Sequence, residues 1–260
     1  MNALPILLPV MWGLITFGTA MSVYRTGLPL SMILLALFPW FLPLEWAVFI
    51  AACVHFLDYS VKFSVMKNRA KVKSVLTFGL PAMVGAWLGA GFFTDLINYS
   101  SIQIGESGIS PFYVLFSGML LLSAAAEWMT DSSGLIALHM PRGVAGVLCG
   151  MASGMSGVFD SFKKILYKPS DENFVQYSAT MIVSSLFSDM MRIPVYLAMI
   201  HRPVSGAHVK PLAIAAVAGA LIGIMVGLRY FKEAPNAVLR RWSLLAVGVS
   251  SLGILLKNLL

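Results

Sequence analysis

Long apolar stretches alternate along this chain with short polar segments. A helix needs about 20 mostly apolar residues to cross the hydrocarbon core of a bilayer. The pattern predicts nine helical segments, at 4–22, 28–42, 44–65, 75–97, 111–130, 142–160, 174–199, 211–231 and 240–260. Segment 28–42 is too short to span comfortably, and 4–22 lacks the preceding basic residues of a signal peptide. We therefore expect an all-α polytopic membrane protein that retains its first segment.

Two of the apolar stretches are interrupted. Small and helix-ending residues between Thr19 and Pro29 separate 4–22 from 28–42, and Gly150, Gly154 and Gly157 precede the charged run that begins at Asp160. The chain therefore divides into two structural repeats, 1–135 and 136–260. Each repeat is expected to open with a broken helix or re-entrant hairpin (4–42 and 142–172) and to continue with three transmembrane helices (44–65, 75–97 and 111–130; 174–199, 211–231 and 240–260).

The distribution of Lys and Arg tests two topologies. If each broken segment crosses once, eight basic residues fall on one side and seven on the other. If each returns to its own side as a hairpin, ten share one side and three lie opposite. The second division matches the positive-inside tendency and makes the halves inverted repeats, a recurring transporter design. It places the basic loop at 67–73 in the cytoplasm, although 4–22 is long enough to cross fully, with 28–42 as its returning arm.

Composition narrows the class of protein further. Hydrophobic residues make up 58% of the chain and charged residues 11%, with a mean hydropathy of +0.84, whereas a soluble domain has about 25% charged residues. A soluble enzyme, a nucleic-acid-binding domain and a disordered segment are excluded. The net charge of +7 is interpreted as topology plus an anion path. Cys53 and Cys149 lie in apolar stretches without metal-ligand spacing, so we expect no metal, no cofactor and no enzymatic activity.

Ionisable residues inside apolar helices are the most informative. His55, Asp58 and Lys62 are separated by three and four positions, which places them on one helical face. Asp189 and Arg192 recur three apart in 174–199. Charge is expensive at membrane depth. Two interpretations stay open: structural ion pairs between helices, or a cavity in which His55, Asp58, Lys62 and Asp189 couple transport to a proton or sodium ion.

Basic residues also stand beside both breaks. Arg25 lies in the first break, and Lys163 and Lys164 follow the second. Helix N-termini at such breaks expose N–H groups that favour anions. These residues and Arg192 are candidates for a small-anion site, and hydroxyl donors are available from Ser22, Thr26, Ser153, Ser156 and Ser161. In the alternative interpretation, the basic groups lie at the interface and contact lipid headgroups.

Small residues are repeated in 85–91 and 219–227, where Gly and Ala allow helices to approach closely. We interpret both stretches as packing faces, which would also permit a homodimer.

The whole layout resembles the TauE/SafE family of bacterial membrane transporters. The resemblance rests on the glycine-rich opening of each half (Gly13, Gly18 and Gly27; Gly146, Gly150, Gly154 and Gly157), the polar long helix, the basic loop, the Gly-x-x-x-Gly pairs at 85–89 and 219–223, and the ending from Phe231 to Trp242. In place of the family's denser glycine runs, this chain has Thr19 to Ser22 and Val158 to Asp160.

The resemblance implies a secondary active transporter in the bacterial inner membrane. Its substrate would be a small anion, such as a sulfur oxyanion, an organosulfonate or a small organic acid. A passive anion channel or permease and a non-transporting membrane assembly subunit are the alternatives.

Overall fold

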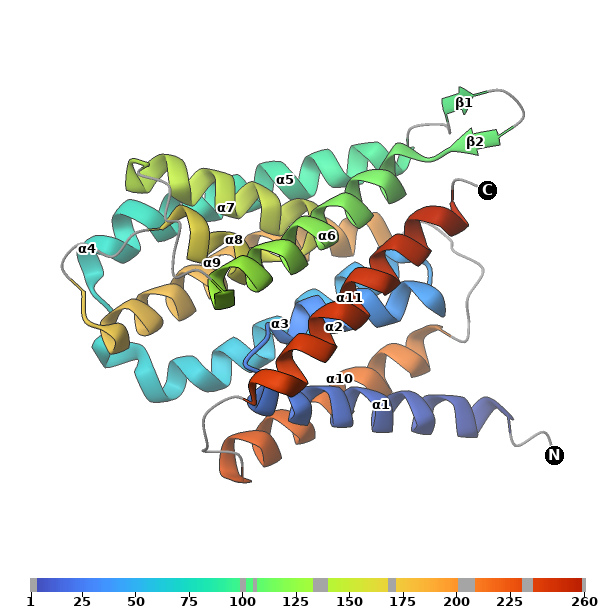
Figure 1. Ribbon diagram of the computed structural model, residues 1–260, viewed down its shortest axis with the longest axis horizontal. Helices are drawn as coiled ribbons and strands as arrows, with labels where there is room; N and C mark the ends of the chain where they lie inside the picture. The colour runs from blue at the N-terminus through green and yellow to red at the C-terminus, as the bar shows by residue number, and fades with distance from the viewer. Residues whose placement is uncertain are drawn as a thin grey trace.

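The computed structural model describes residues 4–98, 102–104, 107–132, 140–167, 172–200, 209–230 and 236–258, and these form a helical molecule (Figure 1). The helices are α1 (Leu4–Thr26), α2 (Leu30–Leu37), α3 (Leu44–Met66), α4 (Val72–Ser74), α5 (Leu80–Asn98), α6 (Pro111–Ser132), α7 (Arg142–Ser156), α8 (Phe159–Leu166), α9 (Phe174–Ile200), α10 (Val209–Tyr230) and α11 (Ala237–Lys257). Short turns follow α2 (η1, Phe38–Trp40) and α3 (η2, Lys67–Arg69), and a π-helical turn (η3, Val75–Gly79) joins α4 to α5. An antiparallel hairpin, β1 (Ile102–Ile104) and β2 (Ser107–Ile109), precedes α6.

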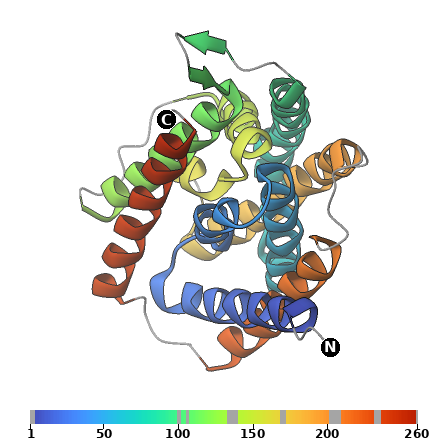
Figure 2. The ribbon, with the colours of Figure 1, turned by 90° about the vertical axis from the view of Figure 1, so that its right-hand side faces the viewer.

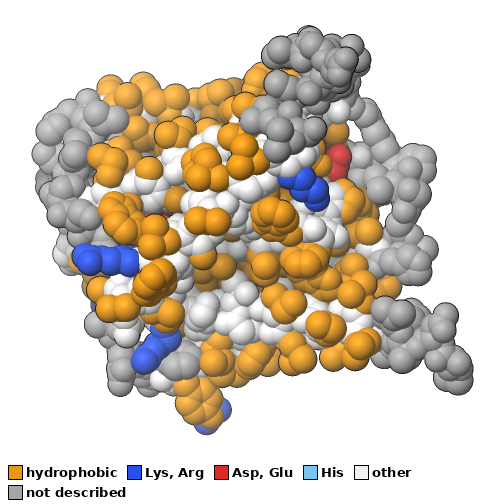
Figure 3. Space-filling view, turned by 45° about the vertical axis from the view of Figure 1, so that its right-hand side comes forward, with side chains coloured by type: hydrophobic (Ala, Val, Ile, Leu, Met, Phe, Trp, Pro, Cys, Tyr) orange, Lys and Arg blue, Asp and Glu red, His pale blue; other side chains and the backbone are white. Residues whose placement is uncertain are grey.

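Seven helices in the described residues are long and apolar enough to cross a membrane. They are α1, α3, the continuous stretch of α4 to α5, α6, α9, α10 and α11. Hydrophobic side chains cover most of the described surface on the face shown in Figure 3, with only a few Lys and Arg side chains among them. This is the pattern of a polytopic membrane protein, as the apolar stretches predicted. The predicted limits were close: the expected helix at 174–199, for example, is Phe174–Ile200.

The long helices pack in pairs drawn from opposite halves of the chain. Helix α1 lies against α10, α5 against α7, α3 against α9, and α6 against α11 (Figures 1 and 2). Glycine lets α5 and α7 approach closely. A Cβ atom on Gly85 or Gly89 would collide with the backbone of α7, one on Gly150 with that of α5, and one on Gly146 with the backbone of η3 at Phe78. The stretch at 85–91 is therefore a packing face, as expected.

The second small-residue stretch packs in the same way. A Cβ atom on Gly219 or Gly223 of α10 would collide with the backbone of α1 at Gly13 or Phe17. This stretch too is a packing face, and both faces are occupied inside one chain.

Each of the two breaks is set by a glycine in the left-handed region of backbone space. Gly27 has φ +65° and is followed by Pro29, which precedes α2. Gly157 has φ +76° and separates α7 from α8. Only glycine adopts such a φ without steric cost.

The first break is shorter than the sequence suggested. Helix α1 continues through Thr26. The polar residues that were expected to end it are accommodated because their hydroxyl groups donate hydrogen bonds to carbonyls of the same helix. The hydroxyl of Thr19 donates to the Ile15 carbonyl at 2.8 Å, and that of Ser22 donates to the Thr19 carbonyl at 2.8 Å. Such bonds let Ser and Thr lie within a helix at membrane depth.

Helix α1 runs from the right of Figure 1 to the left, and α2 leads back towards the right, where α3 begins. Thus α1 has the length of a full crossing and α2 belongs to its returning arm. In Figure 2 the blue helix α2 lies near the middle of the molecule, and six of its eight residues are buried. Helix α7 enters from the left and α8 turns back at Gly157 (Figure 1).

Candidate functional site

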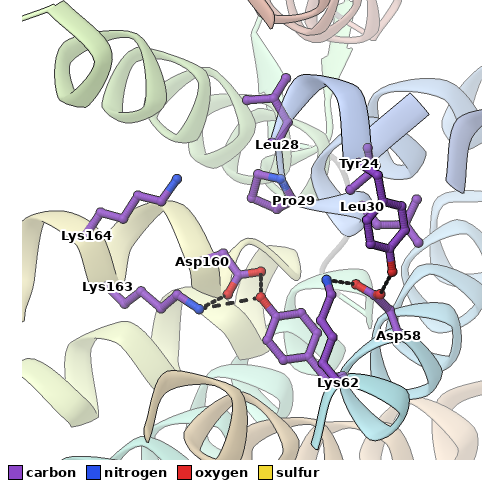
Figure 4. Close-up of a pocket in the computed structure, with 12 residues that line it drawn as sticks. Tyr24, Leu28, Pro29, Leu30, Asp58, Lys62, Asp160, Lys163 and Lys164 are labelled. Carbon is purple, nitrogen blue, oxygen red and sulfur yellow. Dashed lines mark hydrogen bonds and ion pairs between the residues drawn. The ribbon is translucent and has the colours of Figure 1, made fainter. Parts of the chain in front are cut away.

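A cavity of about 290 Å³ lies where the two breaks meet α3 (Figure 4). Four elements line it: the end of α1 with the following break, the start of α2, one face of α3, and α8. Its ionisable lining residues are Tyr24, Asp58, Tyr59, Lys62, Asp160, Lys163 and Lys164, and its apolar lining residues include Val23, Leu28, Pro29 and Leu30. The sequence-predicted residues Asp58, Lys62, Lys163 and Lys164 are thus brought together at one cavity.

On the α3 side, Asp58 and Lys62 form an ion pair. Nζ of Lys62 lies 2.6 Å from Oδ2 of Asp58, and the Tyr24 hydroxyl donates to Oδ1 of Asp58 at 3.1 Å. The Lys62 side chain is 25% exposed and that of Asp58 2%. The ammonium also lies 4.9 Å from the centre of the Tyr59 ring, within cation–π range. The pair is part of the cavity wall, and the hydrogen bond from Tyr24 to Asp58 links α1 to α3.

On the α8 side, Asp160 is the centre of a buried polar cluster. It accepts hydrogen bonds from Lys163 and from the Tyr59 hydroxyl, the latter at 2.5 Å. Oδ2 of Asp160 also lies 3.2 Å from Nε2 of His55. Lys163 and Asp160 are three positions apart, so α8 brings them to one face. Asp160 therefore joins the cavity to the interior of the protein.

Behind the cavity, His55 connects Asp160 to α9. Nδ1 of His55 lies 2.7 Å from Oδ2 of Asp189, and both side chains are buried. Asp189 accepts from Nε of Arg192 at 2.8 Å. A continuous chain of polar contacts thus runs from Lys163 through Asp160, His55 and Asp189 to Arg192.

Arg192 has a second role at the end of α7. Its Nη1 donates to the Ser153 carbonyl at 2.9 Å, and the Tyr196 hydroxyl donates to the Gly154 carbonyl at 2.5 Å. The last carbonyls of a helix lack the N–H groups of a following turn. The Gly157 N–H donates to the Ser153 carbonyl at 2.7 Å, and the break leaves both carbonyls inside the protein. Side chains of α9 satisfy them. Arg192 and Asp189 are accordingly a buried ion pair within α9.

A third charged cluster holds the first break. Glu127 of α6, fully buried, accepts from Lys164 at 2.7 Å and from Nη2 of Arg240 at 2.6 Å. Nη1 of Arg240 donates to the Gly27 carbonyl at 3.1 Å and to the Thr26 carbonyl at 3.4 Å. The two breaks therefore share one feature: in each, an arginine from another helix donates to backbone carbonyls beside the interruption.

Several residues expected at an anion site lie elsewhere. Arg25 is half-buried and is not among the described residues that line the cavity. The hydroxyls of Ser22, Thr26 and Ser156 donate to carbonyls of their own helices, as at Ser156, which bonds to Ala152 at 2.8 Å. The Ser161 hydroxyl accepts from Ser123 at 2.8 Å. Ser153 is buried behind the cavity, where its carbonyl accepts from Arg192.

Five residues of these clusters had been given no role from the sequence: Tyr24, Tyr59, Glu127, Asp160 and Arg240. Three of them could have been found from the sequence. Asp160 stands three positions before Lys163, and Tyr59 stands four positions after His55, on the same helical face. Glu127 is the lone acid in the apolar stretch 111–130, a position that by itself marks a functional or structural partner.

Among the residues that the structure describes, no group of three or more His, Cys, Asp and Glu side chains is arranged to hold a metal ion. Comparison with protein-family models, with curated proteins and with solved structures gave no match to this chain.

Proposed function

We propose that this protein is a secondary active transporter of a small anion, and that the cavity between the two breaks is its substrate site. The observation that carries the proposal is the lining of the cavity: three lysines and two tyrosine hydroxyls converge there at the junction of interrupted helices. Interrupted helices at membrane depth are tolerated where they line a cavity, and they form the binding sites of many transporters.

The charge and size of the cavity favour a small anion. Lys62, Lys163 and Lys164 outnumber the two lining carboxylates. A volume of about 290 Å³ lies at the lower end of the range for ligand pockets, roughly 300–1,000 Å³. Sulfite, a short organosulfonate or a small carboxylate fits this volume, and each presents the oxygen atoms that ammonium and phenol groups bind.

We also propose that residues 1–135 and 136–260 are inverted structural repeats. The helix pairings support this. In the proposed repeats, α1 corresponds to α7, α3 to α9, α5 to α10 and α6 to α11. This correspondence makes the α1–α10 contact equivalent to the α7–α5 contact, and it maps the α3–α9 and α6–α11 contacts onto themselves. In Figure 1, α3 runs from right to left and α9 from left to right, and α5 and α10 are likewise opposed. The two cavity-forming breaks then become equivalent.

The same view supports a cytoplasmic position for the left side of Figure 1. Outside the two breaks, eight described basic residues lie at or beside helix ends on that side, and two, Lys210 and Lys257, lie at ends on the right. The eight are Lys67, Arg69, Lys71, Lys73, Arg142, Arg229, Arg240 and Arg241. This asymmetry follows the positive-inside tendency and supports insertion in the bacterial inner membrane.

The resemblance to the TauE/SafE family supports a sulfur-containing substrate. Within the proposal, the lysines bind the anion, and His55, Asp58, Lys62 and Asp189 couple its movement to a proton or sodium ion. Arg25, Arg192 and the hydroxyls of the breaks stand outside the cavity wall and contribute, in this proposal, by holding the breaks in place.

Purified protein tests the site directly. Sulfite, sulfate, methanesulfonate and acetate are screened for a rise in thermal stability, because a ligand that binds the native state stabilises it. Lys164→Gln is the informative variant, since Glu127 keeps Arg240 as a partner and folding is preserved. Loss of one charge-assisted hydrogen bond, about 1.5–3 kcal/mol, weakens binding by roughly 10- to 150-fold. Lys210→Gln, at the start of α10, is the matched control.

Flux in proteoliposomes then separates the classes of function. A secondary transporter accumulates the stabilising anion only when a proton or sodium gradient is imposed. Flux that ignores both gradients indicates a channel, and a protein that neither responds to ligands nor moves anions is an assembly subunit. Either result overturns the proposal.

A further inference from the structure

His55 contacts a carboxylate through each of its two ring nitrogens. Nδ1 lies 2.7 Å from Oδ2 of Asp189, and Nε2 lies 3.2 Å from Oδ2 of Asp160. A neutral imidazole has one N–H and one bare nitrogen, and an ionised carboxylate can only accept. Both contacts are hydrogen bonds only when the three side chains hold one proton more than a neutral histidine and two carboxylates.

The surrounding cations place that proton on the imidazole. Arg192 contacts Asp189 at 2.6 Å, and Lys163 is paired with Asp160. Each carboxylate thus has a cation of its own, which favours its ionised form. The imidazole is the remaining group that can hold the proton, and as imidazolium it donates to both carboxylates at once.

The other ionisable groups near this cluster do not offset this charge. The Asp58–Lys62 pair of α3 is neutral as a whole. The phenols and thiols that interact with the charged members of the cluster are those of Cys53 and Tyr59 of α3, Cys149 of α7, and Tyr177 and Tyr196 of α9. Three cations, namely Arg192, Lys163 and imidazolium, therefore face two carboxylates. One buried positive charge is left over beside the cavity, and a bound anion would balance it.

We propose that the proton on His55 decides whether Lys163 is available to the substrate anion. This inference rests on the proposed function and names its coupling group. With the proton present, His55 and Tyr59 stabilise the charge of Asp160, and the anion takes Lys163. Without the proton, Asp160 depends on Lys163 and competes with the anion for the ammonium. Proton and anion therefore bind together, about one proton for each negative charge.

The protonation of His55 can be observed without any transport assay. The chain has three other histidines, and the variant His139→Gln/His201→Gln/His208→Gln leaves His55 as its sole imidazole. Nitrogen-15 NMR of labelled histidine in nanodiscs at pH 7 should show both ring nitrogens protonated. A neutral ring with one bare nitrogen overturns the inference, whatever the protein transports.

The competition between Asp160 and the anion is tested by binding. Methanesulfonate is the probe, because its own charge does not change near neutral pH. In the triple-histidine variant, its Kd should rise about tenfold per pH unit above the pH at which the NMR signal of His55 loses a proton. Further replacement of His55 by Gln should abolish this slope. Asp160→Asn should also give a Kd independent of pH, because the competing charge is gone.

Two results contradict the mechanism. One is a slope that persists after His55→Gln, and the other is a constant Kd while His55 titrates. If methanesulfonate, sulfate and sulfite all fail to bind wild-type protein, the proposed function fails, and the NMR spectrum alone still decides whether His55 carries the proton.

Discussion

The contact between α5 and α7 makes a sharp prediction about a single methyl group. Gly150 of α7 faces the backbone of α5. A Cβ atom there would lie closest to the carbonyl oxygen of Ala82, 2.7 Å from the carbonyl carbon of Ala82 and 2.8 Å from the nitrogen of Ala86. All three are main-chain atoms of a helix, so they cannot rotate away as the end of a flexible side chain would. In Gly150→Ala, the Cβ atom and the Ala82 carbonyl oxygen must separate by roughly 1 Å or more to approach an ordinary van der Waals distance.

The expected loss of stability follows from two opposing effects. Overpacking of this kind lowers the free energy of unfolding by about 1–3 kcal/mol. The better helix propensity of alanine raises it by about 0.5–1 kcal/mol. A net loss of about 1–2 kcal/mol corresponds to a fall in Tm of roughly 2–8 °C for a protein of this size. Thermal unfolding of purified protein in detergent measures it.

Gly91→Ala is the matched control on the partner helix. A Cβ atom on Gly91 meets no other atom within 4 Å, so this variant should keep or raise the Tm. In Gly219→Ala, the new Cβ atom meets the backbone of α1 at Gly13. The Tm of this variant should fall as far as that of Gly150→Ala. Equal Tm values for the variants at Gly150 and Gly91 would refute the packing argument.

Three further predictions concern the charged groups and the topology. Asp189→Asn should lower the free energy of unfolding by about 3–5 kcal/mol, because it leaves a buried guanidinium without its ionic partner. Asp58→Asn should lower it much less, because its partner Lys62 is partly exposed. Equal Tm values for the two variants would contradict this prediction. Glu127→Gln should loosen the first break, so that a cysteine placed in the cavity reacts faster with a maleimide than in the wild-type background; an unchanged rate would show that this cluster does not restrain the cavity. Cysteines at Lys67 and Lys257 should be labelled from opposite sides of sealed vesicles, and labelling from one side would reject the topology.

Helix limits and small-residue faces could be predicted from the sequence because they depend on local pattern. An apolar stretch of sufficient length forms a helix wherever it lies, and α9 ended within a residue of its prediction. The glycines at 85–89 and 219–223 similarly predicted close contact with another helix, but they did not indicate which helix that would be. The full length of α1 was harder to predict. Thr and Ser often end helices, but here their hydroxyl groups donate to carbonyls of the same helix, and the helix continues.

The candidate site could be predicted only in part. Pairs within one helix, such as Asp58 with Lys62 and Asp189 with Arg192, follow from spacing of three or four residues. Contacts between helices do not: His55 meets Asp189 across 134 positions and Asp160 across 105. Arg25 shows the converse, since its place beside a break in the sequence did not bring it into the cavity wall.

Composition and the pattern of apolar stretches were therefore sufficient to predict a helical membrane protein with two interrupted segments and a small set of intramembrane charges. Too few charged residues are present to coat a soluble surface, and the apolar stretches have the length of a bilayer. Which charges share a cavity and which hold the breaks together could not be predicted in this way. That outcome depends on the pairing of helices from opposite halves of the chain, and it is the pairing that places one histidine between two carboxylates.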